Sequence, residues 1–317
     1  MKKILSLLFG GLILTGAAEG HFLKLMLART SEARSDRILR RAPEDSEAIK
    51  LRAERALLLP HERLSLRSDD SLMLRACFFP GERSDICAIC VHGYRSSGLR
   101  DHASTLCGYL SRGVSVLLPD CRAHGESEGR VIGFGWSDRL DLEKWCAAVR
   151  ERLPGCRIIL HGVSMGSAAA LCAAADHPPG LAGVVADCPY SDALEEFRHV
   201  TRKYLHLPCF PFLNLTLLLA RVFCGFRVKD CSPVASAPRI TVPVLLIHGE
   251  NDSFVPTEMS HRIYDACRCP KRLLIVPGAE HGVSGKIAPR AYWSAVDSLL
   301  NLISGENAES RPDDADG

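Results

Sequence analysis

The chain of 317 residues is 47% hydrophobic, and its 39 basic and 37 acidic residues leave a formal net charge of +2. This length and composition allow one sizeable hydrophobic core, as in single-domain α/β enzymes. The near-balance of charge gives no reason to expect a nucleic-acid partner.

The N-terminal segment, residues 1–27, differs from the rest of the chain. Two lysines at the start precede a mostly apolar run from Ile4 to Ala18, which is typical of a signal peptide or an uncleaved membrane anchor. The run is shorter than the roughly 20 apolar residues of a comfortable membrane span, so an amphipathic helix packed on the domain is the alternative. We expect the segment to export the protein or attach it to a membrane; otherwise the protein is cytoplasmic.

The 14 cysteines show no convincing metal or redox motif. Cys87 and Cys90 have C-x-x-C spacing, but they lie in an apolar run that predicts a strand. Residues three apart on a strand point to opposite faces and cannot readily share a metal. We interpret the cysteines as buried thiols, which suits a reducing compartment and conflicts with export.

A charged, Arg/Glu-rich helical segment is predicted for residues 28–61, and short apolar runs then alternate with helical patterns. The predicted strands are Leu72–Phe79, Ile86–Val91, Val114–Pro119, Arg157–Gly162, Ala182–Asp187, Val242–His248 and Arg272–Val276. Helical patterns cover Asp138–Leu153, Met165–Asp176 and Thr257–Cys267. This alternation predicts a parallel sheet with helices on both faces, and ligands of such sheets bind at the carboxyl ends of the strands.

The alternation stops at about residues 190–238, where the sequence is helical, apolar and punctuated by proline. An insertion of this kind after a strand end predicts a cap over the ligand site, and Phe210 and Phe212 of the cap are expected to contact the substrate. An ordinary crossover with two extra helices is the alternative. The polar, acidic tail, residues 305–317, is predicted to be disordered.

The sequence Gly162-Val163-Ser164-Met165-Gly166 lies between a predicted strand and a helix of small residues. A G-x-S-x-G sequence alone is a weak signal, but this strand–turn–helix context is that of a nucleophile elbow. The glycines are expected because side chains there would collide with neighbouring backbone. The turn places the Ser164 hydroxyl at a helix N-terminus, where negative charge is stabilised.

A serine hydroxyl is a poor nucleophile until a base takes its proton. Asp252 and His281 each follow a predicted strand, so both are expected at the same edge of the sheet as Ser164. The order Ser–Asp–His is that of α/β-hydrolases, in which the acid fixes the imidazole tautomer. Asp187, which also ends a strand, is an alternative acid.

An oxyanion hole needs two backbone N–H donors aimed at the developing charge. The N–H of Met165, directly after the nucleophile, is the first expected donor. The second is expected from the loop His92-Gly93-Tyr94, with Tyr94 as the donor and its ring as a further contact to the substrate.

The segment Asp120-Cys121-Arg122-Ala123-His124-Gly125-Glu126-Ser127-Glu128-Gly129 resembles the D-x-R-G-H-G-x-S-x-G signature of the α/β-hydrolase superfamily. It is similar in particular to the serine aminopeptidase (S33)/monoacylglycerol-lipase-like branch and its bacterial membrane-anchored esterase-type members. The motifs above extend the match over about residues 62–304; Ala123 stands where the family usually has glycine. The resemblance implies a mostly parallel eight-stranded sheet flanked by helices, a small helical cap, a Ser-His-Asp triad and no cofactor.

The expected function is hydrolysis of a carboxylic ester, with a small, apolar or lipid-like acyl substrate, through an acyl-enzyme. A serine peptidase of the aminopeptidase type is the alternative, and Asp187 or Glu195 would then bind the substrate's amino terminus. A non-catalytic binding module predicts a broken triad. Epoxide and haloalkane hydrolases are disfavoured because their chemistry needs aspartate in place of Ser164.

Overall fold

The computed structural model describes residues 27–38, 42–204, 206, 209–224 and 227–305. Apart from Leu27 and Gly305, the predicted N-terminal signal or anchor and the predicted disordered tail lie outside these ranges. The strands are β1 (Glu62–Arg67), β2 (Met73–Phe79), β3 (Arg83–Val91), β4 (Val114–Pro119), β5 (Arg157–Val163), β6 (Leu181–Asp187), β7 (Val244–Gly249) and β8 (Lys271–Val276).

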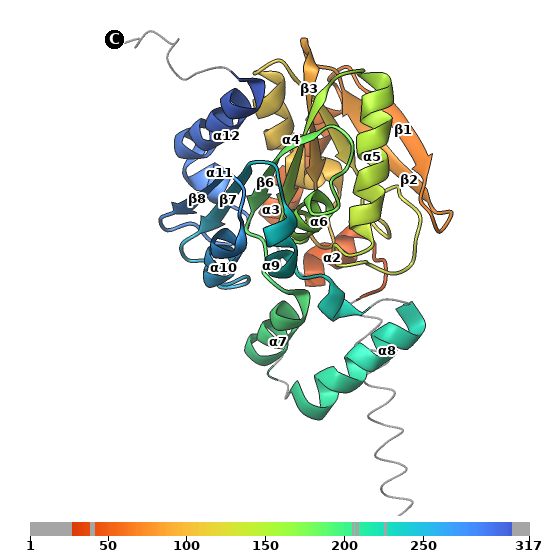
Figure 1. Ribbon diagram of the computed structural model, residues 1–317. Helices are drawn as coiled ribbons and strands as arrows, with labels where there is room; N and C mark the ends of the chain where they lie inside the picture. The colour runs from red at the N-terminus through yellow and green to blue at the C-terminus, as the bar shows by residue number, and fades with distance from the viewer. Residues whose placement is uncertain (1–26, 39–41, 205, 207–208, 225–226, 306–317) are drawn as a thin grey trace, which may run out of the picture.

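The strands form one eight-stranded sheet in the order β1-β2-β4-β3-β5-β6-β7-β8 (Figure 1). Only β2 runs antiparallel to its neighbours, β1 and β4, and the remaining pairs are parallel. This confirms the predicted mostly parallel sheet. Strand β1 was missed by the sequence pattern because its side chains are exposed or half-buried at the sheet edge and form no apolar run.

Helices cover both faces of the sheet. They are α2 (Glu32–Ile38), α3 (Pro43–Ala56), α4 (Gly98–Leu110), α5 (Asp138–Arg152), α6 (Met165–Ala174), α10 (Glu258–Ala266), α11 (Ser284–Ile287) and α12 (Pro289–Ser304). Side chains of α5, α6 and α10 form one hydrophobic core with one face of the sheet, and those of α4 and α12 form a second core with the other. Cys87 packs in the first core and Cys90 in the second, so these cysteines do point to opposite faces.

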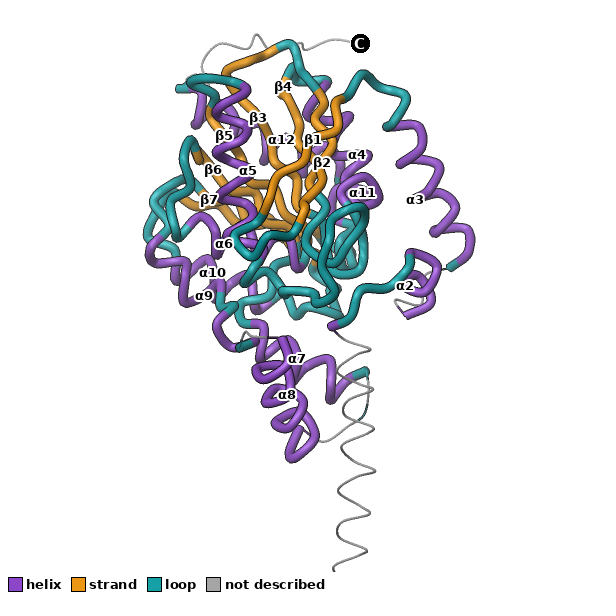
Figure 2. The backbone as a smooth tube through the Cα atoms, turned by 90° about the vertical axis from the view of Figure 1, so that its right-hand side faces the viewer, coloured by secondary structure: helices purple, strands orange, loops and turns teal. Residues whose placement is uncertain are grey.

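The chain between β6 and β7 is helical. It contains α7 (Ala193–Lys203), the π-helical turn η1 (Cys209–Leu213), α8 (Asn214–Cys224), η2 (Val228–Asp230), α9 (Pro233–Ser236) and η3 (Ala237–Arg239). Its described residues form no strand. In both views α7 and α8 extend beyond one end of the helix–sheet–helix body (Figures 1 and 2). This is the position expected of a cap.

The N-terminal helix α2 packs against the loops around the start of α4. The buried Arg100 of α4 forms ion pairs with Glu32 at 3.1 Å and Asp36 at 2.8 Å, and Arg95 donates a hydrogen bond to Thr30. Because Arg95 lies in the loop after β3, the segment of residues 30–38 helps to hold that loop in place. Within the described ranges, every helix is too short or too polar to cross a bilayer.

Candidate active site

The turn from β5 into α6 holds Ser164 in a strained backbone conformation. Ser164 has φ 54° and ψ −117°, which side-chain-bearing residues rarely adopt, and its N–H donates to the Asp187 carbonyl oxygen at 2.8 Å. A Cβ on Gly162 would lie 2.3 Å from the Gly166 backbone, and one on Gly166 would lie 2.0 Å from the Val91 carbonyl oxygen. Both glycines are therefore required for steric reasons.

Ser164, His281 and Asp252 form a continuous hydrogen-bonded chain. His281 Nε2 lies 2.9 Å from Ser164 Oγ, and His281 Nδ1 lies 2.7 Å from Asp252 Oδ2. The Asp252 side chain is fully buried, whereas the His281 side chain is 26% exposed. The arrangement therefore allows His281 to take the hydroxyl proton while Asp252 holds the imidazole in the required tautomer.

Asp252 is held as a carboxylate by several donors. Its Oδ1 accepts the backbone N–H groups of Phe254 and Val255 at 3.0 and 2.9 Å, and its Oδ2 lies 3.2 Å from His248 Nε2 as well as beside His281. Burial alone would raise the pKa of Asp252, but the hydrogen bonds from His248, His281 and Val255 lower the pKa below its usual value. Asp252 is therefore ionised at neutral pH.

His248, near the end of β7, is a second histidine beside Asp252. Its Nδ1 lies 2.6 Å from Ser260 Oγ, and its Nε2 also lies 3.0 Å from the Val255 carbonyl oxygen. Because the Val255 carbonyl oxygen can only accept, the ring proton sits on Nε2, between that oxygen and Asp252. The only sequence signal was the spacing of four residues between His248 and Asp252.

Asp187, the alternative acid, lies beneath the elbow and has a different role. Its carbonyl oxygen accepts the Ser167 hydroxyl at 2.6 Å. Its carboxylate receives a hydrogen bond from Tyr292, and its Oδ1 has no hydrogen-bond partner within the described part of the chain. Burial raises the pKa of Asp187 to about 6. Because His281 Nδ1 bonds to Asp252, the geometry favours Asp252 as the acid of the triad.

The loop after β3 lies against the nucleophile. A Cβ on Gly93 would lie 3.5 Å from Ser164 Cβ, and the Gly93 N–H donates to Asp101 Oδ2 at 2.8 Å. Tyr94 therefore follows a residue in contact with Ser164, and Met165 opens α6 with only 1% of its surface exposed. Both residues are at the positions expected of oxyanion donors, and that role stays a prediction. The sequence analysis missed Asp101, which anchors this loop.

The segment Asp120–Gly129, which follows β4 and resembles the superfamily signature, shapes the site without supplying reacting groups. Asp120 accepts the N–H groups of Gly98 and Glu126 at 2.9 and 2.8 Å, which ties the signature to the start of α4. Ala123 has φ 62°, a conformation in which glycine is unstrained and alanine costs roughly 1 kcal/mol. The glycine usual in the family is therefore explained by backbone geometry.

An aromatic row leads from the loop after β3 to the cap. The Tyr94 ring stacks on Phe134 with centroids 5.3 Å apart, and Phe134 meets Phe197 of α7 edge-on at 4.8 Å. Phe210, a predicted substrate contact, lies in η1 and is 77% exposed. The side chain of Phe212, the other predicted contact, lies outside the described residues. Phe134 and Phe197 were not singled out from the sequence.

Glu196 of α7 is a buried carboxyl group close to the triad. Burial, followed by the negative charges of Asp252 and Glu195, raises the pKa of Glu196 from 4.5 to about 8. Between these pH values the folded protein keeps a proton on Glu196 that the unfolded chain has released. The contribution of this group to stability is therefore fully present below about pH 4.5 and is lost as the pH rises to about 8.

We therefore expect the free energy of unfolding to fall between pH 5 and 8, with up to about 4 kcal/mol of the fall due to Glu196. Glu196→Gln removes the ionisable group and is expected to flatten this pH dependence. Urea unfolding of both proteins at pH 5 and pH 8 measures the difference. Equal pH dependence in the two proteins would contradict the assignment.

One group of described residues brings together atoms of the kinds that can bind a metal ion. Atoms of Cys188, Asp252 and His281 lie within 4.8 Å of one another. Asp252 and His281 are already hydrogen-bonded in the triad, and burial raises the pKa of the Cys188 thiol well above its usual value. The donors therefore serve proton transfer better than metal binding.

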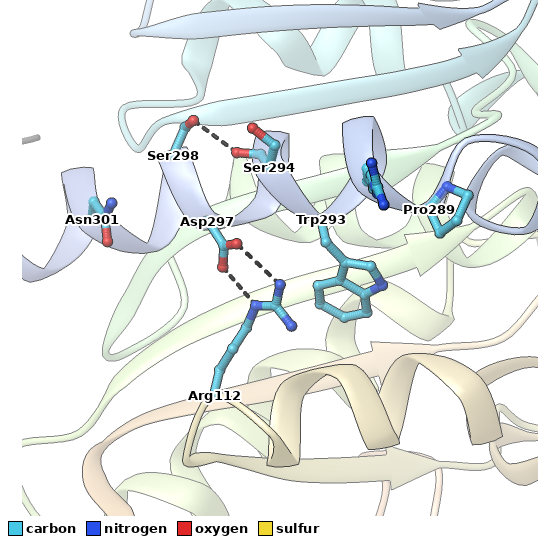
Figure 3. Close-up of a pocket in the computed structure, with 8 residues that line it drawn as sticks. Arg112, Pro289, Trp293, Ser294, Asp297, Ser298 and Asn301 are labelled. Carbon is cyan, nitrogen blue, oxygen red and sulfur yellow. Dashed lines mark hydrogen bonds and ion pairs between the residues drawn. The ribbon is translucent and has the colours of Figure 1, made fainter. Parts of the chain in front are cut away.

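A separate surface pocket lies along α12 (Figure 3). Arg112 and Asp297 in this pocket are paired with each other, with Nη2 and Oδ2 3.0 Å apart, and Arg112 stacks over the Trp293 ring at 4.3 Å. No residue of the triad lines this pocket. Because it lies apart from the triad, and its Arg112 and Asp297 are paired with each other, it is not the site of the proposed chemistry.

The strand order, the elbow after β5 and the chain order of the triad define the α/β-hydrolase fold. The family model of the alpha/beta hydrolase fold matches residues 89–208, and that of serine aminopeptidase, S33, matches residues 228–285. The esterase Pf2001 of Pyrococcus furiosus has a similar structure, with TM-score 0.64 and 24% identity, covering 78% of this chain and 92% of that one. The chain thus has the α/β-hydrolase fold.

Two curated relatives are similar in sequence. YqkD of Bacillus subtilis (strain 168), an uncharacterized protein, is 31% identical over 195 residues, which cover 61% of this chain and 64% of that protein. Lysophosphatidylserine lipase ABHD12 of Danio rerio is 28% identical over 193 residues, which cover 58% of this chain and 47% of that protein. The similarity therefore spans less than two thirds of the length of these relatives.

Proposed function

We propose that the protein is a serine hydrolase that cleaves carboxylic esters through an acyl-enzyme. The observation that carries this proposal is the chain of two hydrogen bonds, 2.9 Å from Ser164 to His281 and 2.7 Å from His281 to Asp252. A buried carboxylate, an imidazole and a serine hydroxyl in this order form the relay that acyl transfer requires.

The proposed reaction has two halves. Ser164 Oγ attacks the ester carbonyl carbon while His281 Nε2 takes its proton, and the N–H groups of Met165 and Tyr94 bind the oxyanion. The tetrahedral intermediate collapses, and the protonated His281 returns the proton to the leaving alcohol. Water, activated by His281, then attacks the acyl-enzyme and releases the acid with Ser164 restored.

The aromatic row of Tyr94, Phe134 and Phe197 runs from the loop beside the nucleophile to the cap. This row favours an ester with an apolar group over a charged peptide as the substrate. Apolar walls with few polar groups are typical of sites for small molecules and acyl chains. The name of the relative ABHD12, a lipase, is consistent with an ester substrate.

Attachment of the protein to a membrane through residues 1–27 remains a proposal based on sequence alone.

A serine peptidase of the aminopeptidase type is the second candidate, because the serine aminopeptidase, S33, model matches residues 228–285. The two groups expected to bind a substrate amino terminus have other partners. Glu195 forms an ion pair with Arg262 at 2.8 Å, and Asp187 lies beneath the elbow with Tyr292 as a partner. These positions favour the ester proposal over the peptidase.

Labelling with a fluorophosphonate tests the proposal, because this probe reacts covalently with an activated serine. We expect mass spectrometry to find the label on the peptide containing Ser164, and we expect Ser164→Ala to remain unlabelled. A panel of acyl esters, lysolipids and aminoacyl anilides then compares the two candidates. Faster turnover of the anilides than of the esters would favour the peptidase, and labelling of another serine would refute the proposed nucleophile.

A further inference from the structure

Arg95, in the loop after β3, is held in an energetically unfavourable state. The residue is 3% exposed, and its backbone has φ 58°, a left-handed conformation that residues with a side chain rarely adopt. Burying a charged side chain also costs free energy unless other groups replace its water. Such a combination persists only where neighbouring residues hold it in place, and it is typical of functional sites. Arg95 directly follows Tyr94, the expected second oxyanion donor.

The contacts of Arg95 join two loops of the candidate site. Its guanidinium group lies over the Tyr94 ring, 4.9 Å from the centroid, and donates a hydrogen bond to the Tyr94 side chain. Its backbone N–H donates to His124 Nε2 at 3.0 Å, and His124 belongs to the segment Asp120–Gly129. The position of Tyr94 therefore depends on where Arg95 is held.

Thr30, near the start of the described chain, holds the outer end of Arg95. Arg95 Nη1 donates a hydrogen bond to Thr30 Oγ1, and the same oxygen lies 2.8 Å from Ser35 Oγ in α2. An arginine side chain can only donate, so the Thr30 oxygen is the acceptor. Ser35 is itself buried. Thr30 thus links α2 to the loop that carries Tyr94.

The rest of the N-terminal segment, residues 27–38, is fastened to the same part of the molecule. Arg29 donates to the carbonyl oxygens of Gly125 and Ser127, and Ala28 forms an antiparallel bridge with Val131. In both views α2 lies at the end of the helix–sheet–helix body from which the cap extends (Figures 1 and 2). We call residues 27–38 the N-terminal strap, because they contact both of the loops that Arg95 joins.

We propose that the N-terminal strap positions the oxyanion donor of Tyr94 through the contact between Thr30 and Arg95. This inference rests on the proposed function, because an oxyanion forms only when Ser164 attacks a carbonyl group. Thr30 and Arg95 are positioning residues, since they act through Tyr94 and not on the substrate. Detaching the strap, which directly follows the predicted signal or anchor, therefore lowers the rate of the reaction at Ser164.

The effect of the strap is expected on the chemical step. Backbone N–H donors stabilise an oxyanion best when they are already fixed at the position where the charge develops. A displacement of about 1 Å caused by a distant substitution can lower the rate about 100-fold. The oxyanion is absent from the bound substrate, so loosening Arg95 is expected to lower kcat while KM stays nearly constant.

Thr30→Val tests the contact, because valine has nearly the shape of threonine but cannot accept the hydrogen bond of Arg95. With p-nitrophenyl butyrate as the substrate, we expect kcat to fall about 10- to 100-fold and KM to change by less than about twofold. Thr30→Ser keeps the hydroxyl group and is expected to restore kcat to within about threefold of the wild type.

The matched control is Thr241→Val, since Thr241 precedes the start of β7, whereas Asp252 follows its end. The Thr241 hydroxyl lies 3.3 Å from His177 Nδ1, and its loss is expected to leave the kinetics unchanged. A fluorophosphonate probe counts the active sites of each protein, so kcat is expressed per labelled Ser164. We expect Thr30→Val to reach the same final extent of labelling as the wild type, at a lower rate.

An unchanged kcat per labelled site in Thr30→Val overturns the proposal, as does a loss of kcat that Thr30→Ser does not restore. If Thr30→Val yields too little labelled enzyme, the same comparison on Ser35→Ala decides, because that change releases Thr30 from α2 without altering Arg95. Labelling of the wild type at a serine other than Ser164 refutes the proposed function instead. The two failures are thereby distinguished.

Discussion

Replacing Ser164 with alanine is expected to lower kcat for p-nitrophenyl butyrate by about a million-fold, because no other group can form the acyl-enzyme. The hydroxyl of Ser164 lies 2.9 Å from the only base in the relay, His281 Nε2. Removing the nucleophile leaves the other members in place, and a residual rate above that in water is expected from the oxyanion donors and binding. Steady-state kinetics with the chromogenic ester measures the loss.

The fold of the Ser164 variant needs its own check, because the residue has φ 54°. Alanine can adopt the same strained backbone as serine, so circular dichroism and Tm are expected to match the wild type closely. Ser298→Ala, a hydroxyl on α12 that donates to the Ser294 carbonyl oxygen, is the matched control and is expected to keep full activity. Equal rates in wild type and Ser164→Ala would show that another residue is the nucleophile.

Replacing Asp252 with asparagine is expected to lower kcat about ten-thousand-fold while preserving the loop. The amide oxygen of asparagine can still accept the N–H groups of Phe254 and Val255, as Oδ1 of Asp252 does. The amide NH2 would then face His281 Nδ1, which must become an acceptor and move its proton to Nε2. That tautomer cannot take the proton of Ser164, so kcat falls while substrate binding changes little.

Asp187→Asn is the matched comparison, since Asp187 was the alternative acid. Its carboxylate bonds to Tyr292 and its Oδ1 is unpartnered, so losing its charge is expected to change kcat less than tenfold. The kinetics of both variants, measured side by side at neutral pH, separate the two assignments. A large loss in Asp187→Asn with a small loss in Asp252→Asn would assign the acid to Asp187.

The three residues of the hydrogen-bonded triad could be located from the sequence because each belongs to a short local pattern. The turn requires small residues at Gly162 and Gly166, although only the clash at Gly162 is with the turn itself and the clash at Gly166 is with Val91 of the neighbouring strand β3. Asp252 and His281 follow β7 and β8, and the carboxyl ends of parallel strands meet at one edge of the sheet. The topology therefore brought the three side chains of the triad together as expected.

The cap was predicted less completely. Its helical character could be deduced from the absence of strand patterns between β6 and β7, but the residues facing the site could not. Phe210 was chosen for its apolar side chain and is largely exposed, whereas Phe197, one helix earlier, packs inward. Which side of an amphipathic helix faces the body depends on how the helix docks, and docking is set by contacts with residues far away in the sequence.

The sequence by itself determined the chain order of strands β2 to β8, the elbow and the order of Ser164, Asp252 and His281, because these depend on local backbone sterics and hydrophobic periodicity. The tertiary structure alone decided that His248 shares Asp252 with His281 and that Glu196 is buried without a hydrogen-bond partner among the described residues. A hydrogen bond or an unsatisfied carboxyl group depends on distances of a few ångströms between elements packed from different parts of the chain. Such distances exist only after the core has formed.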